Sequence, residues 1–110
     1  MSIFLDVMKE ELERNIYKQN AFINELNNLP KGYLSECLID NRKYVYRKYR
    51  VKDKIVSEYV GVPGDDAVLK AYEDRANYIK LSKAIKLLKK EEQKLRKAIK
   101  DYEKLWIRNG

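Results

Sequence analysis

Basic and tyrosine side chains alternate along one short stretch in the middle of the chain. Arg42, Tyr44, Tyr46, Lys48 and Arg50 occupy every second position, and in a β-strand such residues share one face. Cationic groups bind phosphates, and tyrosine rings stack on unpaired bases or pack inside a protein. The stretch therefore predicts either a face that contacts nucleic acid or a second buried side of a sheet.

A second group of cations follows near the end of the chain. Residues 80–100 carry nine positive and two negative side chains, a net charge of +7, and residues 30–62 carry eight and four, a net of +4. Within residues 80–100, five lysines recur at helical spacing: Lys83, Lys86, Lys90, Lys94 and Lys97. Concentrated positive charge attracts polyanions, but a lysine-rich helix face also serves solubility alone. Both interpretations stay open.

Several kinds of catalytic chemistry are disfavoured by composition. The chain has no histidine and a single cysteine, Cys37, so histidine-dependent triads and structural zinc sites are not expected. Most carboxylates alternate with lysines on predicted helices, which is typical of solvated charge. The four glycines form no phosphate-binding loop. We expect a protein that is not an enzyme and that uses neither a cofactor nor a metal.

The elements that must position these side chains form an α+β pattern. Apolar steps of three and four predict a helix over residues 3–28, and Pro30 ends it. Three antiparallel strands are predicted at 33–39, 42–51 and 54–60, joined by two-residue turns. A helix without internal proline or glycine follows from 65 to 108. We expect a single domain, 1–110, with the helices packed antiparallel, and we expect Asp65 or Asp66 to cap the second one.

The register implied by those turns pairs Ile39 with Arg42 and Val51 with Lys54. It divides the sheet into a mostly aliphatic face, which suits packing on a helix, and a face of tyrosines, serines and basic groups. Which face is buried is not decided by the sequence.

The second helix also carries a heptad seam with one acidic interruption, Glu92. Its apolar members include Leu81, Ile85, Leu88, Leu95 and Ile99. The first helix is one partner for this seam, and a second copy of the chain, giving a homodimer, is the other.

No apolar run approaches the ~20 residues that span a bilayer, and the chain lacks the features of an export signal. With one cysteine, no internal disulfide can form. We expect a cytoplasmic protein without membrane contact.

The segment LPKGYLSECLIDNRKYVYRKYRVKDKIVSEYVG, residues 29–61, is similar to small uncharacterised proteins of phages and low-GC bacteria. More distantly it resembles the arm-type DNA-binding domain of tyrosine recombinases. That resemblance implies a three-stranded sheet placed in a DNA major groove, with contacts from Tyr44, Tyr46, Lys48, Arg50 and Ser57. The long helices on either side depart from the recombinase pattern, and we expect no recombinase catalytic domain after them.

Together these features predict a small nucleic-acid-binding accessory protein of phage or mobile-element type. Its partner would be nucleic acid or a nucleoprotein complex. The alternative is a protein-binding module, such as an anti-CRISPR-like inhibitor of a nucleoprotein or nuclease, or another coiled-coil interaction module.

Overall fold

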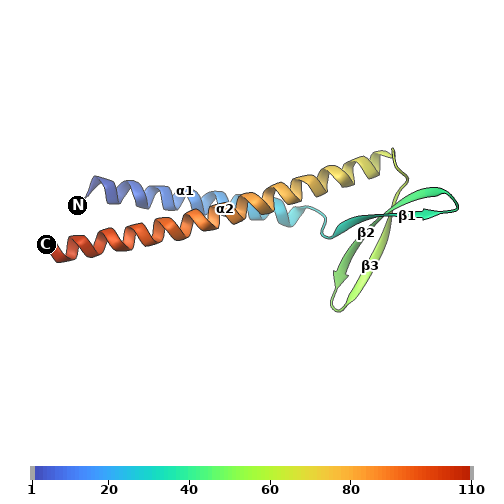
Figure 1. The fold of residues 1–110 in the computed structure, drawn as a ribbon. Coiled ribbons are helices and arrows are strands. Elements are labelled where there is room, and N and C mark those ends of the chain that lie inside the picture. Colours follow the sequence, from blue (N-terminus) through green and yellow to red (C-terminus); the bar gives the residue numbers. More distant parts are fainter. Residues whose placement is uncertain (1, 110) are drawn as a thin grey trace. The chain divides into compact units, whose positions relative to one another are not determined.

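The chain folds as an α+β protein in the order helix, three-stranded sheet, helix, as the sequence predicts (Figure 1). The computed structural model describes residues 2–109, with side chains described for residues 2–106. Helix α1 spans Ile3–Asn28 and helix α2 spans Asp66–Asn109. Strands β1, β2 and β3 span Tyr33–Ile39, Arg42–Val51 and Lys54–Gly61. Predicted and observed boundaries differ by one residue at most.

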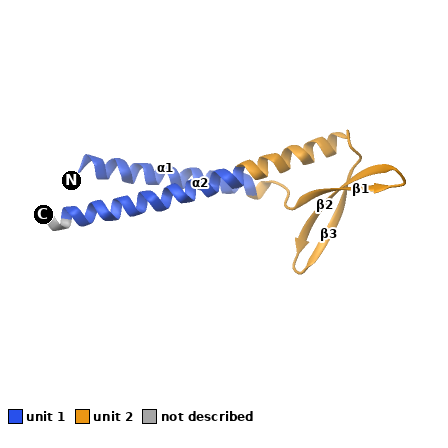
Figure 2. Cartoon of the chain, viewed as in Figure 1, with its two compact units in different colours: residues 1–26, 81–110 blue, residues 27–80 orange. Residues whose placement is uncertain are grey.

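The chain divides into two compact units (Figure 2). The first, here the hairpin unit, contains residues 1–26 and 81–110, and the second, here the sheet unit, contains residues 27–80. Helix α2 contributes residues 66–80 to the sheet unit and its remaining turns to the hairpin unit. Each unit has its own buried side chains.

The hairpin unit pairs α1 with the second part of α2 along the predicted seam. Met8 of α1 and Ile85 and Ile99 of α2 are buried there. Ser2 caps α1 by accepting a 3.4 Å hydrogen bond from the Leu5 amide, and its hydroxyl lies 2.8 Å from the Tyr102 hydroxyl. Within this chain, α1 therefore covers the seam. A homodimer through Leu81, Ile85, Leu88, Leu95 and Ile99 stays a prediction, and it would need α1 to be displaced or exchanged.

A polar layer interrupts the apolar seam where the sequence shows its acidic residue. Gln19 donates from Nε2 to Asn15 Oδ1 at 2.7 Å and to Glu92 Oε1 at 2.8 Å. Asn15 in turn donates from Nδ2 to the Leu88 carbonyl at 2.9 Å. Asn15 and Gln19 are both buried, and their hydrogen bonds are lost if the helices slide. Such a layer fixes the register of a helix pair.

The sheet has the predicted order and register, with β2 between β1 and β3. Asp40, Asn41 and Lys52 adopt positive φ angles of 50°, 66° and 56°, as tight hairpin turns require. One irregularity was not predicted. A bulge at Val45 and Tyr46 places Gly61 opposite Val45, which turns Gly61 toward α2 and leaves Val60 as the extra residue.

The aliphatic face of the sheet packs on the first turns of α2. Val45, at 0% exposure, Val68 and Ala71 form this small core. Gly32, in the same unit, has a positive φ and lies close to the backbone of β2. A Cβ at this position would lie 2.2 Å from the Lys48 carbonyl oxygen. The apolar residues Leu69, Tyr72 and Ile79, which dominate the pattern of this segment, are exposed instead. The buried Val68 and Ala71 each come one residue before Leu69 and Tyr72.

Within residues 2–109, no helix has an apolar segment of the length and hydropathy needed to cross a membrane.

Candidate nucleic-acid interface

Five lysines form a stripe on α2 in the hairpin unit, here called the lysine stripe. Lys83, Lys86, Lys90, Lys94 and Lys97 are all exposed. At 100° per residue they lie opposite the seam that contains Ile85 and Ile99, so packing on α1 pushes them toward solvent. The stripe extends about 21 Å along the helix at 1.5 Å per residue. Its geometry suits a linear polyanion.

The lysine stripe is not neutralised by the acids of its own unit. Where side chains are described, the ion pairs of the hairpin unit join Lys9 to Glu103, Arg14 to Glu11 and Arg96 to Glu92, and none includes a stripe lysine. Lys86, Lys90 and Lys94 instead neighbour one another at i,i+4. Like charges at this spacing destabilise a helix by about 0.2–0.5 kcal/mol per pair. Folding alone does not favour this arrangement.

The second cluster of candidates lies on the face of the sheet that points away from α2, here called the tyrosine face. Arg42, Tyr44, Tyr46, Lys48 and Arg50 alternate with the buried Val45 and so share this face. Tyr59 of β3 lies opposite Tyr46 and joins them. The ends, Arg42 and Arg50, are exposed, whereas Tyr44, Tyr46 and Lys48 are partly buried. Over residues 2–106 the three cations form no ion pair.

On this face Tyr59 contacts both Tyr44 and Tyr46. The ring of Tyr59 lies 6.2 Å from that of Tyr44 and 5.5 Å from that of Tyr46, centroid to centroid. The interplanar angles are 54° and 60°, which are the tilted and edge-on arrangements that aromatic pairs favour. The structure therefore brings Tyr59 against Tyr44 and Tyr46, all of which the predicted register places on this face.

The acidic side chains of the sheet are on the opposite face, where they engage tyrosines. Tyr72 donates to Glu36 Oε1 at 3.0 Å, and burial together with this bond raises the pKa of Tyr72. Tyr49 donates to Glu58 Oε1 at 2.5 Å. That hydrogen bond is the main cause of a raised pKa of Tyr49. Both phenols stay protonated at neutral pH and act as hydrogen-bond donors.

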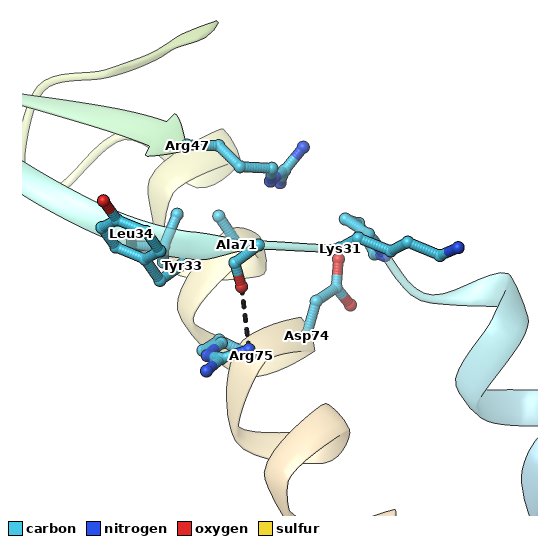
Figure 3. Close-up of a pocket in the computed structure, with 9 residues that line it drawn as sticks. Lys31, Tyr33, Leu34, Arg47, Ala71, Asp74 and Arg75 are labelled. Atoms are coloured by element: carbon cyan, nitrogen blue, oxygen red, sulfur yellow. Dashed lines mark hydrogen bonds between the residues drawn. The ribbon is translucent and has the colours of Figure 1, made fainter. Parts of the chain in front are cut away.

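Sequence reasoning missed a small basic hollow in the sheet unit (Figure 3). Lys31, Arg47, Asp74 and Arg75 line it together with Ala71. Arg75 donates from Nη1 to the Gly32 carbonyl at 2.8 Å, so it mainly fixes the loop before β1. Arg47 could have been found from its register position opposite Glu58, but no sequence pattern links Arg75 to Gly32.

No group of three or more potential metal ligands occurs in residues 2–106. Comparison with known proteins gave no matching family model, no similar characterised protein and no similar solved structure. The resemblance to phage proteins and to the recombinase arm-binding domain therefore stays a prediction, and the surface must be interpreted from its own geometry.

Proposed function

We propose that this chain is a non-enzymatic nucleic-acid-binding accessory protein, of the kind encoded by phages or mobile elements. The observation that carries the proposal is the lysine stripe, whose five exposed ammonium groups have no carboxylate partner in the described part of the chain. On the tyrosine face, Arg42, Lys48 and Arg50 likewise form no ion pair with the side chains of residues 2–106.

The physical basis is the release of counterions from a phosphate backbone. Each phosphate neutralised by a lysine or arginine releases condensed cations, so affinity falls as salt rises. For every phosphate contact, the slope of log K against log salt changes by about −0.7 for single strands and −0.9 for duplexes. Repulsion among the stripe lysines costs stability in the free protein, and a polyanion relieves it.

The proposal is tested by reversing Lys86, Lys90 and Lys94 to glutamate and measuring affinity for labelled oligonucleotides over a range of salt. We expect at least about 100-fold weaker binding at low salt, and a slope that is smaller by about 2–3. Circular dichroism shows whether the helices persist, as expected for exposed positions. In this variant the three glutamates repel one another at i,i+4 much as the three lysines do, so we expect helix stability to change little.

The matched control reverses Lys18, Lys43 and Lys70, which are also exposed but lie outside the lysine stripe and the tyrosine face. Net charge changes equally in both triple variants. Equal losses of affinity would show that only total charge matters, and the absence of binding to any single- or double-stranded oligonucleotide would reject the proposal.

One observation favours the alternative of a protein-binding module. Leu69, Tyr72 and Ile79 line one side of α2 in the sheet unit and are 59%, 42% and 41% exposed. Exposed apolar residues at helical spacing can dock a protein partner, for instance a nucleoprotein or nuclease that this chain would inhibit. Replacing Leu69 and Ile79 with serine separates the two functions, because nucleic-acid affinity would be unaffected.

A further inference from the structure

The tyrosine face has the composition of a surface for bases as well as phosphates. By register it carries Arg42, Lys48 and Arg50 beside Tyr44, Tyr46 and Tyr59, with serines at positions 35 and 57. It has no carboxylate in any strand, because Glu36 and Glu58 both point to the opposite face. A face of cations and aromatic rings without acids is complementary to a ligand that is both anionic and aromatic.

These tyrosines are not needed as the hydrophobic core of their unit. The core lies on the other face, where Val45 and Val68 are 0% and 2% exposed. Tyr59, by contrast, is 58% exposed. In residues 2–106 the hydroxyls of Tyr44, Tyr46 and Tyr59 form no hydrogen bond, unlike those of Tyr49 and Tyr72. Both a ring surface and unused hydroxyls are therefore available to a ligand.

The arrangement of the rings favours unpaired bases over a duplex. In a double helix the faces of the bases are stacked on one another, and a protein reaches only their edges. A major groove about 12 Å wide admits a two-stranded ribbon. Here three strands, spaced about 4.8 Å apart, present rings on both β2 and β3. Such a surface offers ring faces, which stack on splayed bases whatever their sequence but find no exposed base faces in a duplex.

We propose that the tyrosine face binds single-stranded nucleic acid, with unpaired bases stacked on the Tyr44–Tyr46–Tyr59 cluster and phosphates held by Arg42, Lys48 and Arg50. This inference rests on the proposed function and specifies its ligand. Because Tyr59 lies on the edge strand β3 and its ring contacts both of the other rings, it is the principal stacking residue.

The test compares an oligothymidylate of about 12 nucleotides, a length within the usual range of such sites, with an abasic oligonucleotide of the same length. Both carry the same phosphates, so only stacking separates them. We expect the affinity for oligothymidylate to be at least about 10-fold higher than the affinity for the abasic strand. It should exceed the affinity for a duplex of the same length by a similar factor. Oligouridylate in parallel distinguishes RNA from DNA as the source of the single strand.

The variant Tyr59→Leu should weaken oligothymidylate binding about 10-fold and leave abasic binding unchanged, whereas Tyr59→Phe, which keeps the ring, should stay within about 2-fold of the wild type. Tyr17→Leu is the matched control, because Tyr17 is 77% exposed on α1 of the hairpin unit; it should change nothing.

Equal binding of thymidylate and abasic strands would overturn the inference and leave the proposed function standing. Preference for the duplex would also overturn it. If no oligonucleotide binds, the proposed function itself fails.

Discussion

The hairpin unit and the sheet unit present their basic side chains in different surroundings. In the hairpin unit, five lysines lie on one face of α2, and the stretch from Lys83 to Lys97 contains no aromatic residue and only two acids, Glu91 and Glu92. In the sheet unit, three cations surround contacting tyrosines. Flexible lysines supply positive charge without a fixed binding geometry, and such charge mainly raises the rate at which an anionic ligand associates. Rings held by a sheet supply shape, from which any preference among ligands has to come.

The two units are also stabilised differently. The hairpin unit depends on a long side-chain seam with one polar layer at Asn15, Gln19 and Glu92. The sheet unit has a core of very few residues and depends on close approach of the backbone at Gly32. A substitution that destabilises the helix seam should therefore leave the sheet unit folded, and one that disturbs the sheet unit should leave the helix pair intact.

The largest effect is expected from Gly32→Ala in the sheet unit. Its φ of +99° strains any other residue, and the added methyl would meet the Lys48 carbonyl oxygen at 2.2 Å. We expect a loss of about 2–4 kcal/mol in the free energy of unfolding, measured by urea denaturation. Gly64→Ala is the control, since its φ is +96° but nothing lies near its Cβ; it should lose about 1 kcal/mol. Equal losses would show that strain alone decides.

A smaller effect should appear in the hairpin unit when Glu92 titrates. Hydrogen bonds from Gln19 and then Arg96 lower its pKa below the ordinary value of 4.5. A carboxyl whose pKa is depressed by folding stabilises the protein above its unfolded pKa, and this contribution disappears as the pH falls through the folded pKa. Glu92→Gln should therefore melt below the wild type at pH 7, and the difference should vanish in acid.

The control for this comparison is Glu13→Gln, an exposed position on α1, which should leave the melting temperature at pH 7 unchanged. A difference between wild type and Glu92→Gln that persists undiminished at low pH would assign the effect to packing of the side chain and not to its charge.

The smallest expected effect is a gain of stability from Lys52→Gly in the turn between β2 and β3. Lys52 adopts a φ of 56°, which glycine tolerates without strain. We expect an increase of about 0.5–1 kcal/mol in the free energy of unfolding, read from the urea midpoint. Asp53→Gly should produce no gain, because Asp53 is not among the positive-φ residues.

Much of the fold could be predicted because local rules act consistently along this chain. Helix α1 was predicted at its observed bounds, and both hairpin registers followed from two-residue turns. The seam and its acidic interruption followed from heptad spacing. The apolar pattern misled only near the start of α2, where Val68 and Ala71 are buried and the larger Leu69 is exposed. There the buried positions carry smaller side chains than their exposed neighbour, which apolar periodicity does not anticipate.

The candidate surfaces were only partly predictable. Alternation placed Arg42, Tyr44 and Tyr46 on one face, but it did not decide which face the helix covers; Val45 and its contact with α2 do that. The polar layer was missed at Asn15, because an asparagine beside Ile16 looks like ordinary helix surface. Its burial depends on a carbonyl of a distant residue, Leu88, which only the folded chain brings within reach.

The spacing of the stripe lysines has a consequence for rigidity. Three of them, Lys86, Lys90 and Lys94, repel one another along a single ridge of the free helix. If the proposed polyanion binds there, it would screen this repulsion, and binding would then increase the order of the helix. The repulsion among these three lysines destabilises the free helix, and any ligand that neutralises their charge removes that destabilisation.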